Sequence, residues 1–384
     1  MENLYHYTSM QGFESIIKNQ TIRMTRSDFM NDPNDCKVYY NIVKKYINKK
    51  MKNIDVEYYL RNVNDKNKIF LEDVSRLIND YPLNGYLDFV YNHISMYVFS
   101  MTDCKDSLPM WNYYGNDGIC MGFEKESLLV NFAQKMCKTE YDFLAYTKVN
   151  YINVNTKLKD LPLKSLTDIQ LLKKMSEGKV TPYKNLLRES KTDDENVNLE
   201  HFAESYIESY IVTINYLLRD PKERNEIFKE LNEIELDEKL RKEKFYKKIF
   251  SHNRDIEKPE LMFKSHIDIF MLILSAKYKP KTFENESETR IVFFNYDIAQ
   301  DVDEQYTTIK YDFGSFMKPF VDHIQDEKDK KDETWLSNEV KSIILSPSTK
   351  RIPIENNKYK EIIRRFLNKD DSFNIESSKH DIRW

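Results

Sequence analysis

The chain has 384 residues, 32% of them charged and 13% aromatic, with a formal net charge of −4. This composition predicts a folded protein with a sizeable core, argues against disorder, and gives no general attraction to nucleic acid, although it leaves room for a local basic patch. Only seven residues are glycine, and neither G-x-G-x-x-G nor G-x-x-x-x-G-K-[ST] occurs, which excludes the common dinucleotide and phosphate loops.

The first half of the chain is expected to alternate strands and helices. An aromatic strand at 4–8 precedes a helix at 10–18 that Ser9 can cap, and a second strand follows at 21–25. Residues 37–95 carry helical apolar repeats between charged faces. Further strands are predicted at 96–101, 119–123 and 144–152, with a short helix at 107–114 between the first two.

The second half is expected to open with long helices and to end with strands. Residues 155–260 read as helices with mixed charges, and an apolar helix runs from Pro259 to about Tyr278. Strands at 286–294, 306–311 and 340–345, a helix at 355–367 and a last strand at 373–377 follow. The pattern predicts an α+β fold in three parts: 1–154 with a helical insert near 37–95, a helical insertion at 155–258, and 259–384.

Nothing in the sequence indicates a membrane protein, a secreted protein or a metal site. The longest unbroken apolar run covers only 269–274, and no signal peptide is visible at the N-terminus. The four cysteines, without C-x-x-C spacing, predict reduced thiols in the cytoplasm and no bound zinc.

Two aromatic clusters could line a pocket. His6, flanked by Tyr5 and Tyr7, can form a hydrogen bond inside a pocket, or it can be a core histidine bonded to the backbone. Trp111 and Tyr114 lie three residues apart, so on a helix they would share a face. Beside the glycines of 115–122 this pair could hold a planar ring, or it could simply pack in the core.

A third cluster is acidic. In a strand, Glu286, Glu288 and Arg290 would point to one side because side chains alternate between faces. Arg290 would pair with Glu288 and offset the repulsion between the carboxylates. Such a group can orient sugar hydroxyls or stabilise a cationic transition state, and the alternative is an exposed strand edge of alternating charge.

Taken in order, these motifs resemble a known family. They are H-Y-T at 6–8, S-x₁₀-W-x₂-Y-x₃-G-x₃-G-F at 100–123, and K-x₃-F-x₂-E-x-E-x-R at 279–290. The family is a bacterial domain of unknown function, itself similar to the ADP-ribosyltransferase superfamily in the branch with a His, a Tyr and a Glu at the nicotinamide pocket. The turn at 31–33 also fits, with Asp35 where such sequences usually place Glu.

The resemblance covers roughly 1–45, 95–125 and 260–380 and implies a fold and a substrate. The fold would be a split mixed β-sheet core of the ADP-ribosyltransferase type with large helical insertions. The substrate would be NAD, and His6 would bond the ribose hydroxyls on its adenosine side. Tyr114, with Trp111, would stack on nicotinamide, although Tyr7 and Tyr113 compete for this role, and Ser100 would line the same pocket.

For the acidic motif the resemblance implies catalytic roles. Glu288 would grip the 2′-hydroxyl of the nicotinamide ribose and stabilise an oxocarbenium-like transition state. Glu286 would orient or deprotonate the acceptor, and Arg290 would hold both carboxylates in place.

The expected function is therefore NAD-dependent ADP-ribosyl transfer to a nucleic acid or protein by a toxin-like or antiphage effector, restrained by an antitoxin or regulatory protein. One alternative is an NAD glycohydrolase that uses water as the acceptor. A second is a non-enzymatic interaction module, for which the basic run 239–248 with interleaved Phe245 and Tyr246 gives weak support, because the run fits a solvated helix end better. A third, a metal-dependent nuclease on Glu286 and Glu288, needs a further carboxylate or His that the sequence does not place.

Overall fold

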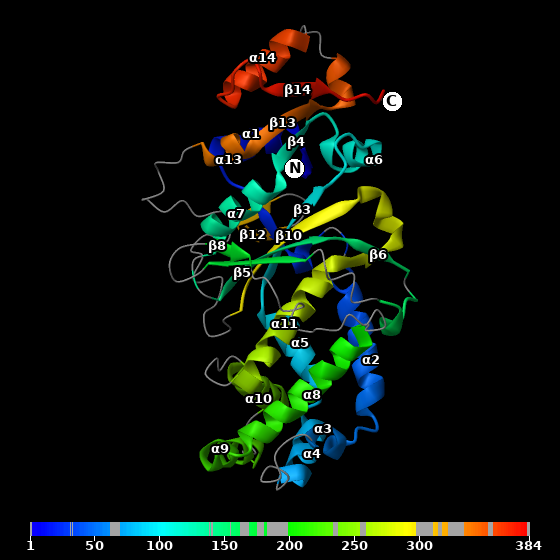
Figure 1. The fold of residues 1–384 in the computed structure, drawn as a ribbon, viewed down its shortest axis with the longest axis vertical. Coiled ribbons are helices and arrows are strands. Elements are labelled where there is room, and N and C mark those ends of the chain that lie inside the picture. The colour runs from blue at the N-terminus through cyan, green and yellow to red at the C-terminus, as the bar shows by residue number, and fades with distance from the viewer. Residues whose placement is uncertain are drawn as a thin grey trace.

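A curled, mixed sheet with helices against both faces organises the chain (Figure 1). The structure is a computed structural model that describes residues 2–30, 32, 34–61, 70–137, 139, 141–153, 155–161, 169–174, 180–182, 199–232, 237–253, 259–296, 310–313, 317–321, 334–351 and 356–381. Over these residues the sheet has twelve strands. This mixed α/β architecture is compatible with the predicted α+β class.

The sheet follows the order β14-β13-β4-β1-β3-β10-β5-β7-β8, with β2, β12 and β11 branching from β3. All described pairings in this sheet are antiparallel except that of β13 with β14. The strands are β1 (Asn3–Thr8), β2 (Met24–Arg26), β3 (Met96–Thr102), β4 (Ile119–Glu124), β5 (Asp142–Lys148), β7 (Gln170–Lys174), β8 (Val180–Pro182), β10 (Glu288–Asn295), β11 (Lys310–Phe313), β12 (Met317–Val321), β13 (Val340–Leu345) and β14 (Asn374–Ser377). A separate parallel pair joins β6 (Asn150–Ile152) to β9 (Tyr278–Pro280).

Two helical layers bury the central strand β10 on both faces. Val292 and Phe294 face a large core with α2, α5, α8, α10 and α11, while Ile291 and Phe293 face a second core with α1, α7, α13 and α14. A strand buried on both sides needs a continuous apolar run, and Ile291–Phe294 supplies it. The helices are α1 (Met10–Asn19), α2 (Val38–Met51), α3 (Val56–Leu60), α4 (Leu71–Asp80), α5 (Leu83–His93), α6 (Leu108–Met110), α7 (Lys125–Met136), α8 (Leu199–Leu217), α9 (Pro221–Asn232), α10 (Glu238–Asn253), α11 (Pro259–Lys277), α13 (Trp335–Glu339) and α14 (Asn356–Phe366).

The sheet forks beside β3, and the fork creates a pocket. β1 pairs with β3 only at Tyr5↔Thr102 and then continues along β4. β2 pairs with the other end of β3, at Thr25↔Val98 and Arg26↔Tyr97. On the side of β3 that faces β1 and β2, the described residues between Val98 and Thr102 therefore have no strand partner. Residues of α1 line the space that this leaves.

Several predicted elements are confirmed, including the first strand and the helix capped by Ser9, whose Oγ accepts a hydrogen bond from the Gly12 amide. The strand predicted at 144–152 is instead two elements in different sheets. β5 ends at Lys148 because the Val149 amide donates to the Glu288 carbonyl, after which the chain joins β9. The stretch 155–258 adds β7 and β8 to the sheet besides its helices. Of the strand predicted at 306–311, residues 306–309 lie outside the described residues.

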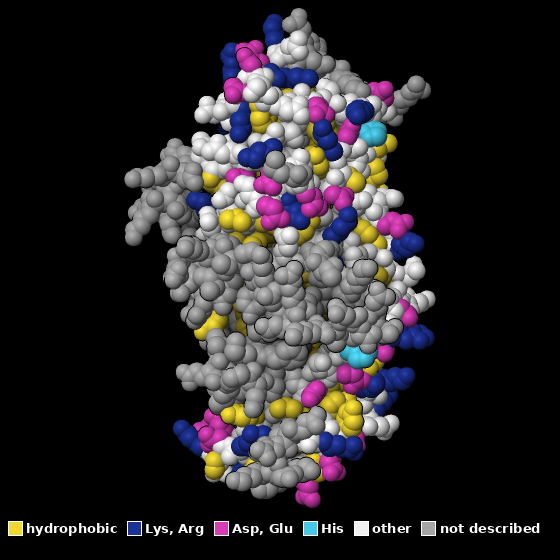
Figure 2. Space-filling model, in the orientation of Figure 1, with side chains coloured by type: hydrophobic (Ala, Val, Ile, Leu, Met, Phe, Trp, Pro, Cys, Tyr) yellow, Lys and Arg dark blue, Asp and Glu magenta, His cyan; other side chains and the backbone are white. Residues whose placement is uncertain are grey.

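The surface mixes acidic and basic side chains. Figure 2 shows Lys and Arg beside Asp and Glu over most of the described part of this face. No helix among the described residues is both long enough and apolar enough to cross a membrane.

Candidate functional site

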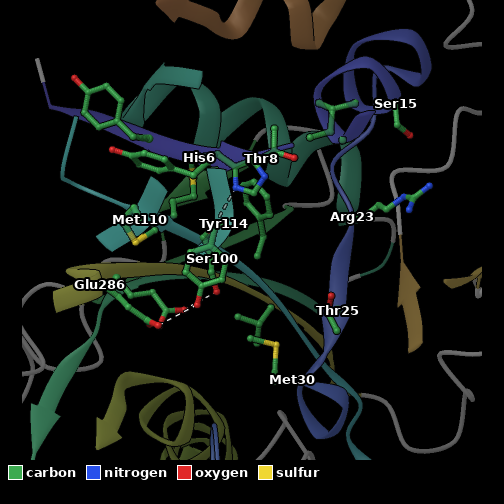
Figure 3. Close-up of a pocket in the computed structure, with 18 residues that line it drawn as sticks. His6, Thr8, Ser15, Arg23, Thr25, Met30, Ser100, Met110, Tyr114 and Glu286 are labelled. Carbon is green, nitrogen blue, oxygen red and sulfur yellow. Dashed lines mark hydrogen bonds between the residues drawn. The ribbon is translucent and has the colours of Figure 1, made fainter. Parts of the chain in front are cut away.

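A cavity of about 330 Å³ occupies the fork between β1 and β2. It brings together residues from the first thirty positions, which include α1, and from the segments around Ser100, Tyr114 and Glu286 (Figure 3). Its lining consists of Tyr5, His6, Tyr7, Thr8, Gly12, Ser15, Ile16, Arg23, Thr25, Met30, Val98, Phe99, Ser100, Met101, Met110, Tyr114, Glu286 and Glu288. Six of the eight predicted site residues therefore line one cavity; Trp111 and Arg290 are not in its lining.

His6 is held as a neutral hydrogen-bonding group. Its Nδ1 lies 3.2 Å from the Ser100 carbonyl oxygen, and its ring packs on Phe99 with centroids 4.6 Å apart. Burial lowers the pKa of His6 from 6.5 to about 4, against the opposing effect of the Ser100 carbonyl. Because Nδ1 carries the proton toward that carbonyl, Nε2 is the acceptor that a ligand hydroxyl can meet.

Tyr114 reaches the cavity from an unusual turn of helix. Residues Trp111–Gly115 form a π-helical turn, closed by a hydrogen bond of 2.6 Å from the Asn116 amide to the Trp111 carbonyl. The Tyr114 hydroxyl donates to Glu286 Oε1 at 3.0 Å. Burial, followed by the charge of Glu286, raises the pKa of Tyr114, so this hydroxyl remains a donor at neutral pH.

Trp111 does not line the cavity, and the prediction that it shares a face with Tyr114 is wrong. The π-turn is wider than an α-helical turn, which changes the angular spacing that places residues three apart on one side. Trp111 is completely buried, and its Nε1 donates to Asp106 at 2.7 Å. A Cβ on Gly115 would overlap the Trp111 ring, so this close approach requires glycine.

Tyr7 borders the cavity, but both its hydroxyl and its ring contact other parts of the protein. Its hydroxyl donates to the Cys104 carbonyl at 3.0 Å and accepts from the Ser107 amide at 2.8 Å, and its ring meets Trp111 edge to face. Of the three competing tyrosines, Tyr114 alone bonds a predicted catalytic carboxylate among the described residues. The geometry therefore favours Tyr114 as the aromatic contact for a ligand.

Arg290 anchors two carboxylates behind the cavity. Its Nε and Nη2 donate to Glu288 at 2.9 and 3.0 Å, and it pairs with both oxygens of Asp35 at 2.8 Å. A further bond of 2.9 Å reaches the Ala276 carbonyl. Arg290 has no exposed surface, so the guanidinium acts as a rigid fork that fixes the carboxylates and does not itself face the cavity.

Lys279 links all three carboxylates of the cluster. Its Nζ lies 2.7 Å from Glu286, 3.0 Å from Glu288 and 3.8 Å from Asp35. With these two cations and three carboxylates, the formal charge of the cluster is −1. Lys279 and Asp35 belong to the motifs quoted above, but no role for them followed from their local sequence, because their partners are distant along the chain.

Glu286 and Glu288 meet by a different route from the one predicted. Glu286 ends a 3₁₀ turn at 281–286, and Ser287 adopts a left-handed backbone with φ of 43°. Of the two glutamates, only Glu288 therefore belongs to β10. The common strand face expected for Glu286, Glu288 and Arg290 is thus wrong for Glu286. The two carboxylates are neighbours because Lys279 bridges them.

Glu288 is a fully bonded carboxylate that is charged at neutral pH. Oε1 accepts from Ser100 Oγ at 2.5 Å and from Arg290, and Oε2 accepts from Lys279 and Arg290. Burial by itself would raise the pKa of Glu288, but the charges of Arg290 and Lys279 outweigh burial and hold the pKa at about 2. Glu286 accepts only two described hydrogen bonds, one on each oxygen, so it keeps acceptor positions for a ligand.

The carboxylate cluster does not resemble a metal centre. Asp35 provides the third carboxylate that a nuclease would need, but Lys279 and Arg290 lie between the acidic groups. Within the described ranges, no group of three His, Cys, Asp or Glu residues could hold a metal ion.

Arg23 is a cavity residue that the motifs did not indicate. It lies across the cavity from Glu286 (Figure 3). Asn31 and Pro33 of the predicted turn lie outside the described residues, whereas the amide of Asn34 donates to Asp32 and that of Cys36 to Asp35. No family model, curated protein or solved structure matches this chain.

Proposed function

We propose that the chain is an NAD-dependent ADP-ribosyltransferase with a split mixed sheet of the ADP-ribosyltransferase type. The observation that carries the proposal is the convergence of His6, Tyr114, Ser100, Glu286 and Glu288 on one cavity. These residues come from three distant segments whose motifs resemble that superfamily. If they had lain on separate surfaces, the proposal would have failed.

The cavity offers complementary groups to the nicotinamide half of NAD. Its volume of about 330 Å³ lies in the range of small-molecule sites. The Tyr114 ring can contact the planar nicotinamide, and neutral His6 can accept a bond from a ribose hydroxyl. Arg23 lines the end of the cavity away from Glu286, which is the side toward which the rest of NAD would extend.

The reaction would begin when the bond between ribose C1′ and the nicotinamide nitrogen breaks and its electron pair leaves with nicotinamide. The ribose then carries positive charge, which the cluster of formal charge −1 stabilises. A nucleophile X–H on the acceptor attacks C1′ and forms the C1′–X bond. Its proton passes to Glu286 and then to solvent, so NAD⁺ and the acceptor give the ADP-ribosyl product, nicotinamide and one proton.

The bonding pattern supports separate roles for the two glutamates. Glu288, saturated by Ser100, Lys279 and Arg290, supplies fixed negative charge at the cavity wall. Glu286 has acceptor positions open and a hydroxyl donor, Tyr114, on its other oxygen. We therefore propose Glu286 as the group that contacts the ribose 2′-hydroxyl or the acceptor, and Glu288 as the electrostatic support.

The biological setting rests on the motif resemblance alone. On that basis we propose a toxin-like or antiphage effector that acts in the cytoplasm and is restrained by an antitoxin or regulatory protein.

The decisive experiment uses NAD labelled on its adenosine half, incubated with the purified chain and a cell lysate, with nicotinamide release measured in parallel. Transfer of label to a macromolecule, lost in Glu286→Gln and Glu288→Gln, is the expected result. The matched control is Glu284→Gln, which removes an exposed carboxylate two residues away. Nicotinamide release without a labelled macromolecule would assign the chain as an NAD glycohydrolase. No release of nicotinamide would refute both the transferase and the glycohydrolase.

A further inference from the structure

A second hollow, outside the proposed NAD cavity, has five lysines among its eleven lining residues. It lies where α2 meets the turn at 158–160 and the start of α8, and its volume is about 590 Å³. We call it the lysine groove. Its lining consists of Ile42, Lys45, Tyr46, Lys49, Lys50, Asn155, Thr156, Lys157, Leu158, Lys159 and Glu200.

The groove carries an excess of positive charge, because its lining holds five lysines and one carboxylate, Glu200. Lys45, Lys49, Lys157 and Lys159 are all exposed, and among the described residues no carboxylate lies within 4.0 Å of their amines. Figure 2 shows Lys and Arg side chains, with Asp and Glu among them, along the right edge, beside the place where Figure 1 has α2. Four exposed lysine amines without a near carboxylate form a site that attracts a polyanion.

The fifth lysine of the groove is already paired. Lys50 contacts Glu204 at 2.5 Å, and the same glutamate accepts hydrogen bonds from the Tyr46 and Tyr59 hydroxyls. Glu204 is thus paired with Lys50 and bonded to two tyrosine hydroxyls, and within the described part of the chain it makes no ion pair with the four exposed lysines.

Both walls of the groove begin at the proposed catalytic cluster. One wall is α2, which follows directly after Asp35, the partner of Arg290. The other follows β6, where the Tyr151 hydroxyl accepts from the Glu288 amide at 2.8 Å. In Figure 1, α6, β6 and α2 follow one another along the right side of the molecule.

The distance between the groove and the cluster suits a short strand of nucleic acid. From Val38, at the start of α2, to Lys49 the helix rises about 16 Å at 1.5 Å per residue. That length equals roughly five stacked nucleotides at about 3.4 Å each. A strand of about five nucleotides that runs along α2 can therefore reach from Lys49 to the start of the helix, close after Asp35 of the cluster.

We propose that the lysine groove binds the phosphodiester backbone of a single-stranded nucleic acid and leads its acceptor nucleotide to Glu286. This rests on the proposed function, whose acceptor it identifies by class. A single strand is favoured because chemistry on a base requires that base to leave the duplex stack.

An acidic protein is a poorer fit to the same surface. Protein interfaces are depleted in lysine at their centres and are anchored by free aromatic side chains. Here the aromatic residue of the groove, Tyr46, is bonded to Glu204, and the Lys50 amine lies 5.4 Å from its ring centroid.

The basic run 239–248, which its sequence suggests as a second nucleic-acid-binding surface, differs from the groove because some of its lysines are paired with carboxylates. Lys242 pairs with Glu238, and Lys248 pairs with Glu223 and Glu226. Phe245 and Tyr246 are buried in the core and cannot stack on bases. The exposed lysines of this region therefore make a matched control for those of the groove.

The test is the binding of fluorescently labelled 15-nucleotide single-stranded DNA and RNA of mixed sequence, measured by anisotropy between 50 and 200 mM salt without NAD. The groove variant is K45Q/K49Q/K157Q/K159Q. The control, K229Q/K239Q/K244Q/K247Q, removes the same charge from exposed positions of α9 and α10. Thermal unfolding of both variants checks that they are folded.

We expect the groove variant to lose at least about tenfold in affinity at 100 mM salt and the control to lose little. The slope of log K against log salt should flatten by up to about 3 in the groove variant, since each phosphate contact on a single strand contributes about 0.7. Preference for DNA or RNA identifies the natural source of the phosphodiester strand.

Three outcomes would overturn the proposal: wild-type protein that binds neither oligonucleotide at 50 mM salt, equal losses in the two variants, or competition by polyglutamate as strong as that by the oligonucleotide. The last result would assign the groove to acidic proteins. The binding assay requires neither NAD nor turnover, so it tests the groove even if no nicotinamide is released. Nicotinamide release and label transfer test the proposed enzymatic function in a separate assay.

Discussion

The charge of Glu288 should stabilise the folded chain by an amount that depends on pH, and Glu288→Gln isolates it. Glutamine keeps the size of the side chain and one acceptor oxygen but cannot ionise. In the native protein, Arg290 and Lys279 hold the pKa of Glu288 at about 2, below its ordinary value of 4.5, in spite of burial. The charged form is therefore favoured by folding.

The magnitude follows from linkage. Lowering the pKa of Glu288 from 4.5 to about 2 corresponds to about 3 kcal/mol in the free energy of unfolding at pH 7. Because the folded pKa is depressed, the unfolded chain binds more protons between pH 4.5 and 2. The stabilisation is thus fully present above about pH 4.5 and is lost as the pH falls through 2. At pH 3 about half of it should remain.

Urea unfolding of wild type and Glu288→Gln, followed by tryptophan fluorescence at pH 7 and pH 3, measures the difference directly. Glu284→Gln is the control, because Glu284 is exposed and its weak pair with Lys281 spans 4.0 Å. It should change the free energy of unfolding by less than about 1 kcal/mol at either pH. A gap between wild type and Glu288→Gln that is the same at both pH values would refute the reasoning.

Two further changes probe positions away from the acidic cluster. Gly115→Ala should destabilise the chain by about 1–3 kcal/mol, because its Cβ would overlap the buried Trp111 ring, and the near-ultraviolet circular dichroism of the tryptophans should change with it; an unchanged urea midpoint would contradict this. Asp268 is buried, which raises its pKa to about 6 against the opposing hydrogen bonds from Tyr206, Tyr86 and Tyr296. Since the folded state binds the extra proton, wild type should lose about 2 kcal/mol relative to Asp268→Asn between pH 4 and pH 7, as shown by urea unfolding at both values; a constant gap would mean that Asp268 does not titrate in this range.

The sequence predicts local elements well where a local signal exists. The Ser9 cap, the apolar repeat of α1 and the aromatic strand β1 each depend on neighbouring residues, and each is confirmed. The predicted convergence of His6, Tyr114 and Glu288 on one cavity depended on matching the order of three motifs to a family, because no local pattern places residues that are far apart along the chain side by side.

The parts that could not be predicted depend on tertiary contacts. Trp111 has the same spacing to Tyr114 in an α-helix and in a π-turn, and only packing against Gly115 and Asp106 selects the turn that buries it. Glu286 leaves the predicted strand because Ser287 takes a left-handed backbone, which a serine rarely adopts. The lysine groove joins α2 to residues more than one hundred positions later, so its charge was invisible along the chain.

Burying the charges of the acidic cluster costs the folded state free energy, and this cost argues that the cluster serves a function. Each ion taken out of water carries a penalty of several kcal/mol, and buried ion pairs are often no more stabilising than well-packed apolar residues of the same size. Arg290, Lys279, Asp35, Glu286 and Glu288 are all almost fully buried at or beside one cavity. A requirement for stability alone would be met by apolar packing. A requirement for a fixed carboxylate that is charged at neutral pH at the cavity wall can be met only by burying its counter-ions with it, which is the arrangement that a cationic transition state needs.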